Sequence, residues 1–320
     1  RRPEPFVTAR AAYESAPRMA ALCWRIACLF LCTALAAEHC AVRTPSMIQL
    51  RGEIARPQSL SQTIARAAAK LPGDSATRQL LSSFAVCGNC SKFQRLGEAH
   101  DGGYLTCMDG LGDVSGILSV GVQLHDGWSS MAQRLLGGVP VGQFDCTVSE
   151  GADCGRGCTF HRKCLRSRDD REHFTLGPSV TLREAADLVS GVASGGALLG
   201  KIDIEGSEWP IFEAETRQEL RRFRQLVVEF HGLGVEKNHR RYAAAMRNLL
   251  DAGFRVVHLH GNNCCGMYSP APGLKIPRVV EVTFFADAPA MPHCSLAADA
   301  GPLDAPNVAK APELPPAQLG

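Results

Sequence analysis

Three acidic residues stand within six positions in the segment KIDIEGSEWPIF, residues 201–212. Asp203, Glu205 and Glu208 follow an apolar run, ALLGKIDI, that predicts a buried strand over residues 197–204. Carboxylates exchange protons, hold divalent cations and accept hydrogen bonds from hydroxyl groups. The segment therefore indicates a chemical role at the end of a strand.

Six predicted strands alternate with amphipathic helical patterns in the central part of the chain. The strands cover residues 116–122, 139–146, 197–204, 223–232, 254–261 and 278–286. This alternation is typical of βαβ units, which build a mostly parallel sheet with helices on both faces. No helical pattern separates the last two strands, so we expect the final strand to be antiparallel. Thr181 and Glu184 have the spacing of a helix capping box.

Polar residues follow five of these strands. In an open parallel sheet, ligands bind beyond the carboxyl ends of the strands. The polar exits are residues 123–126, Asp145, Asp203 with Glu205, Glu229 with His231, and Asn262 with Asn263. The recurrence predicts a binding cleft along this edge.

The first two strand exits indicate an adenosine-containing cofactor. Gly121 allows a close approach of the backbone, and Asp145, 24 positions later, suits the hydroxyls of a ribose. Gln123 occupies the place of the second glycine in a G-x-G-x-x-G motif, which argues against a pyrophosphate. S-adenosylmethionine has no pyrophosphate and fits this loop better. We assign Ser119, Gly121, Asp126 and Asp145 to its binding.

The sequence also resembles a known family. KIDIEGSEWPIF is similar to the K-x-D-x-E-G-x-E signature of FkbM-type methyltransferases, and RLGEAHDGGYLTC (95–107) resembles a D-G-G segment of their secreted methyltransferase-like branch. The resemblance covers roughly residues 87 to 286. It implies a Rossmann-like class I fold with a seven-stranded, mostly parallel sheet, and methyl transfer from S-adenosylmethionine, commonly to oxygen. Ser119 and Gln123 depart from the usual first loop of class I enzymes.

Asp203 is the first candidate for the active site, followed by Glu205 and His231. Asp203 would steer the acceptor or take its proton, and a divalent cation shared with Glu205 or Glu229 is an alternative that we do not assign. His231 fits either a general base or a structural histidine. Glu208 fits either the signature or a surface charge that starts a helix. Lys201 alternates with Asp203 and predicts a structural salt bridge.

The composition excludes some partners. Lys and Arg number 34 against 32 Asp and Glu, a net charge of +2, and aromatic residues make up 6%. These values give no basic stripe and no stacking platform, so we expect no nucleic-acid partner. The expected substrate is a small molecule or a glycan.

The ends of the chain predict export and disorder. Residues 1–18 read as an upstream disordered segment, and residues 19–36 as a signal peptide that starts at Met19. We expect a secreted or lumenal protein, which contacts a membrane only if residues 19–36 stay as an uncleaved anchor. Residues 37–80 read as a linker, 81–288 as the methyltransferase domain, and 289–320 as a disordered tail rich in Pro and Ala.

Eleven cysteines follow the expected signal, which predicts disulfides in an oxidising compartment. CGNC (87–90) reads as half of two structural bridges. CGRGCTFHRKC (154–164) has spacings that a zinc site could use, but disulfides are favoured after a signal peptide. The adjacent Cys264 and Cys265 are expected to pair with different partners.

Two other functions stay open. A glycosyltransferase would use Asp203 and Glu205 to hold a metal and a nucleotide sugar. A non-catalytic secreted binding protein that retains the fold would explain Ser119 and Gln123 in the first loop.

Overall fold

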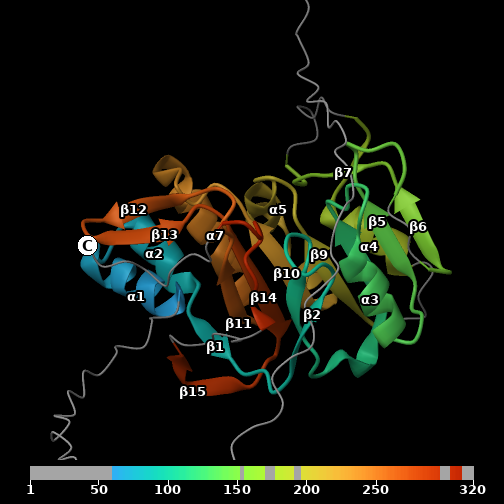
Figure 1. The fold of residues 1–320 in the computed structure, drawn as a ribbon, viewed down its shortest axis with the longest axis horizontal. Coiled ribbons are helices and arrows are strands. Elements are labelled where there is room, and N and C mark those ends of the chain that lie inside the picture. Colours follow the sequence, from blue (N-terminus) through green and yellow to red (C-terminus); the bar gives the residue numbers. More distant parts are fainter. Residues whose placement is uncertain (1–59, 152–154, 170–176, 191–195, 296–302, 312–320) are drawn as a thin grey trace, which may run out of the picture. The chain divides into compact units, whose positions relative to one another are not determined.

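A nine-stranded sheet organises the computed structural model, which describes residues 60–151, 155–169, 177–190, 196–295 and 303–311 (Figure 1). The strand order is β15-β1-β11-β14-β10-β9-β4-β5-β6. The strands are β1 (Val86–Gly88), β4 (Val114–Val120), β5 (Val141–Phe144), β6 (Cys158–His161), β9 (Ala197–Ile202), β10 (Phe223–Phe230), β11 (Phe254–Gly261), β14 (Val280–Ala286) and β15 (Ala290–Ser295).

The strand order has the doubly wound arrangement that the alternating pattern predicts. From β6 through β5, β4, β9 and β10 each neighbouring pair is parallel, and β4 lies inside the sheet. From β6 to β11 this is the order 3-2-1-4-5-6 with β14 inserted between β10 and β11, and β1 and β15 extend the sheet beyond β11. β14 is antiparallel to both β10 and β11. The α/β class and the antiparallel final strand are therefore confirmed.

Three two-stranded sheets and two 3₁₀ turns complete the strands and loops. They are β2 (Phe93–Leu96) with β3 (Tyr104–Cys107), β7 (Cys164–Leu165) with β8 (Ser179–Val180), β12 (Met267–Ala271) with β13 (Leu274–Pro277), and the turns η1 (Leu111–Asp113) and η2 (Glu236–Asn238).

Apolar clusters cover both faces of the sheet because successive strand residues point to opposite sides. On one face, Ile117 and Val227 pack in a cluster with Trp128 of α3 (Gly127–Leu135). On the other face, Leu118 and Val228 belong to a larger cluster. That cluster includes residues of α4 (Leu182–Ser190), α5 (Glu208–Ala214) and α7 (His239–Asp251).

Local signals explain two helix starts and one break. The amide of Glu184 donates to Thr181 Oγ1 at 3.2 Å, and the amide of Thr181 donates to Glu184 Oε2 at 2.8 Å, so the predicted capping box is confirmed. The helical segment from residue 207 to 220 is divided into two helices. It breaks before Thr216, whose side chain caps α6 (Arg217–Leu220).

The expected domain limits are wrong at both ends of the described chain, which belongs to one compact unit. Helix α1 (Leu60–Lys70) and the first part of α2 (Ala76–Ser83) lie within the expected linker, yet Ile64 and Leu80 are buried in the main core. The expected disordered tail contains β15 and the buried Asn307. The upstream segment, the signal peptide and residues 37–59 lie outside the described residues.

Disulfides connect distant parts of this unit. Cys87 pairs with Cys294 and Cys90 with Cys107, so the two cysteines of CGNC form two separate bridges as predicted. Cys146 pairs with Cys164, and Cys158 is also disulfide-bonded, which favours bridges over zinc in residues 154–164. These bridges fit an oxidising compartment.

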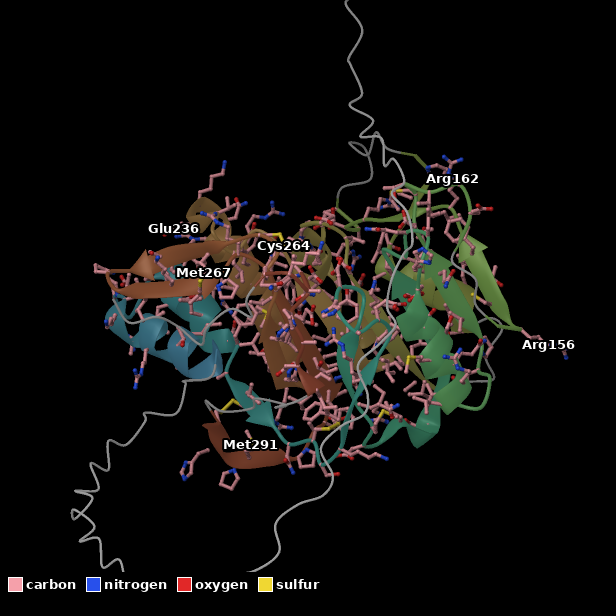
Figure 2. The ribbon with its side chains drawn as sticks, viewed as in Figure 1. Arg156, Arg162, Glu236, Cys264, Met267 and Met291 are labelled. Atoms are coloured by element: carbon pink, nitrogen blue, oxygen red, sulfur yellow. A yellow bond between two sulfur atoms is a disulfide. The ribbon has the colours of Figure 1, made fainter. Side chains whose placement is uncertain are left out.

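The prediction for the adjacent cysteines is wrong. Cys264 and Cys265 pair with each other in the exposed loop between β11 and β12, where Figure 2 labels Cys264. Their Cα atoms are 3.8 Å apart. The bridge therefore joins two neighbouring residues of one loop and does not connect this loop to another part of the chain.

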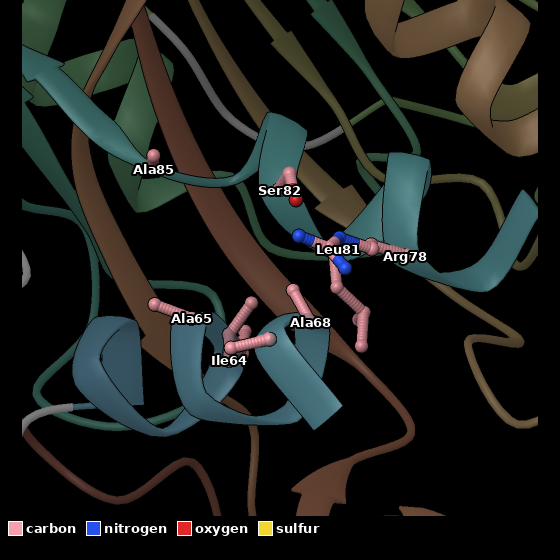
Figure 3. Close-up of a pocket in the computed structure, with 8 residues that line it drawn as sticks. Ile64, Ala65, Ala68, Arg78, Leu81, Ser82 and Ala85 are labelled. Atoms are coloured by element: carbon pink, nitrogen blue, oxygen red, sulfur yellow. The ribbon is translucent and has the colours of Figure 1, made fainter. Parts of the chain in front are cut away.

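Two observations concern the surface. Among the described residues, no helix has the length and apolarity needed to cross a membrane. A groove of about 230 Å³ lies between α1 and α2, lined mainly by alanine and aliphatic side chains (Figure 3). Its Arg78 donates to the carbonyl of Leu71 at 3.0 Å, which engages the charged side chain of this groove.

Candidate functional site

Two adjoining cavities lie beyond the carboxyl ends of β4, β5 and β9. The first holds about 290 Å³ and is lined by residues of the β4, β5 and β9 exits and by residues 163–165. The second holds about 560 Å³ and is lined by the β4 exit, Lys201, Asp203, and Glu98, Asp101 and Gly102 of the turn before β3. Gly121, Gln123 and Asp203 line both cavities. The predicted cleft is thus a pair of cavities that meet at the ends of β4 and β9.

Gly121 brings the ends of β4 and β9 together. Its φ is +76°, and a Cβ at this position would lie 1.7 Å from the carbonyl oxygen of Asp203. Any side chain here would therefore push the two strand exits apart. The approach also lets Lys201 Nζ donate to the Gly121 carbonyl at 2.9 Å.

Gln123 keeps the backbone shape that a glycine would supply. Its φ is +46°, in the left-handed region that side chains disfavour. Its amide donates to Asp145 Oδ2 at 2.9 Å, which fixes the loop against the end of β5. The departure of Gln123 from the glycine-rich motif therefore changes the residue but keeps the turn.

Asp145 lines the first cavity but is strongly engaged by the chain itself. The amide and hydroxyl of Thr147 donate to its Oδ1 at 2.8 and 2.6 Å. Burial raises the pKa of Asp145, but hydrogen bonds from Thr147 and the first loop outweigh burial and lower it. Asp145 is thus a carboxylate whose oxygens already accept several hydrogen bonds.

Asp203 stands where the two cavities meet. Its Oδ2 accepts a hydrogen bond from the Tyr104 hydroxyl at 2.7 Å and lies 3.6 Å from Lys201 Nζ. The predicted salt bridge of Lys201 is confirmed, and Lys201 Nζ also lies 5.2 Å from the centre of the Tyr104 ring. These contacts fix one oxygen of Asp203.

Glu229 forms the inner end of the same polar cluster. Its Oε2 lies 3.3 Å from the Tyr104 hydroxyl, and its Oε1 accepts a hydrogen bond from Asn262 Nδ2 at 2.9 Å. Burial, with the nearby charge of Asp203, raises the pKa of Glu229 to about 7. The hydrogen bond from Asn262 makes this residue a structural partner of Glu229.

His231 lies among carboxylates. Its Nδ1 is 3.0 Å from Glu208 Oε1, and its Nε2 is 3.4 Å from Glu229 Oε1. Burial lowers the pKa of His231, but the carboxylates of Glu208 and Glu229 outweigh burial and raise it to about 11. The carboxylates thus favour the protonated imidazole, and the contacts on both ring nitrogens fit the structural histidine that the sequence left open as an alternative.

Glu205 and Glu208, the other two acids of the segment KIDIEGSEWPIF, differ in how far their side chains are buried. Glu208 is fully buried, and its Oε1 accepts the amides of Ile204 and Gly206 at 3.0 and 3.2 Å, so it is not a surface charge. The Glu205 side chain is 81% exposed, and its backbone has a φ of +57°. Its Oε2 still lies 3.5 Å from His231 Nε2. Glu205 therefore sits at the rim.

Two assigned cofactor residues do not line either cavity. Ser119 is fully buried inside β4. Asp126 caps α3, because its Oδ1 accepts the amide of Ser129 at 3.1 Å and its Oδ2 accepts Gln143 Nε2 at 3.1 Å. Both residues support the loop, and we withdraw them from the cofactor set.

Tyr104 is the main residue that the sequence analysis missed. It precedes Asp203 by 99 positions, and it follows the Asp101–Gly103 segment, which forms a tight turn. The turn itself was visible in the sequence, as two glycines after an acid. Nothing in the sequence showed that the next residue would reach across to β9 and β10.

No protein-family model matches the sequence, and no curated protein is detectably similar to it. Distant structural likenesses exist to methyltransferases of the class I type. A chain of the fibrillarin/Nop5p complex has 10% identity and a TM-score of 0.30, covering 55% of this chain and 73% of that one. The methyltransferase CalO6 has 14% identity and a TM-score of 0.23, covering 54% and 58%.

The O-methyltransferase NcsB1 from neocarzinostatin biosynthesis, solved with S-adenosylmethionine and 2-hydroxy-5-methyl naphthoic acid, has 13% identity and a TM-score of 0.22. The match covers 54% of this chain and 49% of that one. These values are too low for the activities of these proteins to be transferred to this chain.

Proposed function

We propose that the chain is an S-adenosylmethionine-dependent methyltransferase that acts on a hydroxyl group of a small molecule or glycan in an oxidising compartment. The observation that carries this proposal is the position of Asp203, which lines both adjoining cavities at the carboxyl edge of a doubly wound sheet. One cavity offers the loop and acid that suit an adenosine, and the other is left for an acceptor.

The residues of the first cavity fit the cofactor. Gly121 keeps the backbone free of a side chain where the two cavities meet, and Phe144 and Leu165 give apolar walls. Asp145 suits a ribose if a ribose hydroxyl takes the place of the Thr147 hydroxyl on Oδ1. The bound cofactor would supply a methyl group on a positively charged sulfur.

Asp203 would do the acid–base work of the chain. Tyr104 and Lys201 hold its Oδ2, so we assign Oδ1 to the proton of the acceptor hydroxyl. Its negative charge also favours a cationic sulfur beside it. Most of the rate enhancement would come from positioning two bound reactants in line.

A non-catalytic binding protein with this fold is the second candidate. The hydrogen bonds that Asp145 accepts from Gln123 and Thr147 favour it, because they already occupy the oxygens that a ribose would need. Such a protein would keep the fold without the cofactor.

Calorimetric titration of the full chain with S-adenosylhomocysteine separates the two candidates. We expect binding that weakens at least ~10-fold in Asp145→Ala, since a lost charge-assisted hydrogen bond is worth about 1.5–3 kcal/mol. Glu213→Gln, at a partly exposed acid paired with Arg241, is the matched control and should bind normally. No binding by the wild-type chain would rule out the methyltransferase proposal.

A further inference from the structure

The polar cluster around His231 carries more acidic than basic groups. His231 Nε2 is surrounded by carboxylate oxygens of Glu229 at 3.4 Å, Glu205 at 3.5 Å and Asp203 at 4.0 Å. Lys201 is the basic partner of Asp203, and its Nζ also donates to a backbone carbonyl. Three carboxylates from two neighbouring strand exits thus converge on one ring nitrogen.

The spacing is close to that of a coordination shell. Ligand atoms at about 2.1 Å from an octahedral cation lie about 3 Å from one another. The oxygens around Nε2 are 0.4–1.0 Å farther away than that, a difference that small side-chain rotations remove. One donor atom each of Asp203, Glu208 and His231 also lies within 4.8 Å of the other two. These three side chains are therefore close enough to share one ion.

Glu208 gives an independent reason to expect a ligand. It is fully buried, and its Oε1 faces His231 Nδ1 at 3.0 Å. Histidines that bind metals usually donate their other ring N–H to such a carboxylate, which fixes the ring orientation. Its Oε2 is buried and has no hydrogen-bond partner among the described residues. A buried carboxylate oxygen in this state calls for an explanation such as a nearby cation.

We propose that this cluster binds a divalent cation through His231 Nε2, Asp203 and Glu229, with Glu205 closing the site from the rim. The cation would take the place of the proton on Nε2, since a histidine binds a metal only through a deprotonated ring nitrogen. Glu208 is a positioning residue that holds the imidazole. The mixture of carboxylate oxygens and one imidazole nitrogen suits Mn²⁺ and related cations. The site opens toward both cavities through Asp203.

The use of the cation in catalysis rests on the proposed function. A hydroxyl group bound to a divalent cation loses its proton more readily, and the cation fixes its oxygen in place. An acceptor hydroxyl held there would lie beside Asp203, where the two cavities meet. Asp203 Oδ1, the oxygen nearest His231 Nε2, would then hold the cation instead of taking the hydroxyl proton directly. The binding of the cation itself does not depend on methyl transfer.

Titration of the full chain with MnCl₂ after chelator treatment tests the proposal, with free Mn²⁺ read by electron paramagnetic resonance. We expect one site that is lost or weakened more than ~10-fold in Asp203→Asn and in His231→Gln. Glu208→Gln should weaken it by about 10- to 100-fold, the range for residues that orient a ligand. Glu213→Gln, on the same helix but partly exposed and paired with Arg241, should bind Mn²⁺ as the wild type does.

The proposal is overturned if the wild-type chain binds no Mn²⁺ at 1 mM, which is about the weak end of cation sites. It is also overturned if Mn²⁺ binding survives Asp203→Asn and His231→Gln, or if Glu213→Gln loses Mn²⁺ binding to the same extent. Near-ultraviolet circular dichroism checks that each variant is folded, and a folded wild type without Mn²⁺ overturns the proposal by itself. A parallel S-adenosylhomocysteine titration keeps the two proposals apart. Mn²⁺ binding without S-adenosylhomocysteine binding leaves the cation site standing and removes the methyltransferase.

Discussion

Replacing Gly121 by alanine should open the site by forcing two strand exits apart. The new Cβ would lie 1.7 Å from the Asp203 carbonyl oxygen, and such atoms do not approach within 3.0 Å. The ends of β4 and β9 must therefore separate by about 1 Å. Alanine at a φ of +76° costs about 1 kcal/mol, and the forced shift of packed backbone costs a further ~1–3 kcal/mol. We expect a loss of about 2–4 kcal/mol in the free energy of unfolding.

Gly137→Ala is the matched control, because it isolates the backbone cost from the clash. Gly137 has a φ of +72°, and a methyl group added there would meet no atom of the described chain within 4 Å. Urea unfolding of both variants should show a loss of about 1 kcal/mol for Gly137→Ala and a larger loss for Gly121→Ala. Calorimetry should show S-adenosylhomocysteine affinity unchanged in the control and reduced at least ~10-fold in Gly121→Ala, because a 1 Å displacement disturbs the cavity wall.

Equal stability losses in the two variants would refute the reasoning, since the close approach of Gly121 to Asp203 would then carry no cost. Unchanged S-adenosylhomocysteine affinity in a destabilised Gly121→Ala would refute the second half. In that case the ends of β4 and β9 would not form the cofactor wall.

Two further predictions concern the wall of the first cavity. The Cys146–Cys164 bridge joins residues 18 positions apart, and both cysteines line the cavity. The double variant Cys146→Ser with Cys164→Ser should therefore lower the free energy of unfolding by about 3 kcal/mol. It should also weaken the binding of S-adenosylhomocysteine. Cys264→Ser with Cys265→Ser removes a bridge between neighbours and should change neither quantity in urea unfolding and calorimetry. The pKa of Asp145 is lower in the folded chain than its ordinary value of 3.8, so its ionised form stabilises the fold above that pH, and the contribution disappears as the pH falls through the folded pKa. The difference in the free energy of unfolding between wild type and Asp145→Asn should therefore be at its full value at pH 6 and begin to decrease below about pH 4. A difference that grows on acidification would contradict the direction of the pKa shift.

Local patterns in the sequence were enough to predict the central part of the sheet. They did not show β1, β6 and β15, so the sheet has nine strands where the resemblance implied seven. Alternating apolar strands and amphipathic helices can be recognised locally, because the period of side-chain burial differs between the two elements. The missing helix before β14 likewise predicted its antiparallel place. The rule that ligands bind at strand exits then selected Asp203, which lies where the two cavities meet.

Contacts between distant elements determine what each acid does. Asp203, Glu205 and Glu208 look alike in sequence, but the first lines both cavities, the second is at the rim and the third is fully buried. Burial and hydrogen-bond partners come from elements far away in the chain, so no local pattern reports them.

The same reason explains the remaining errors. Tyr104 meets Glu229 across 125 positions, and the raised pKa of His231 depends on carboxylates from α5 and β10. Residues 303–311 read as a disordered tail because they lack periodicity, yet Asn307 Nδ2 donates to the buried Glu281 Oε1. A pairing energy between distant groups depends on their distance and on the solvent excluded around them, and only the folded chain sets both.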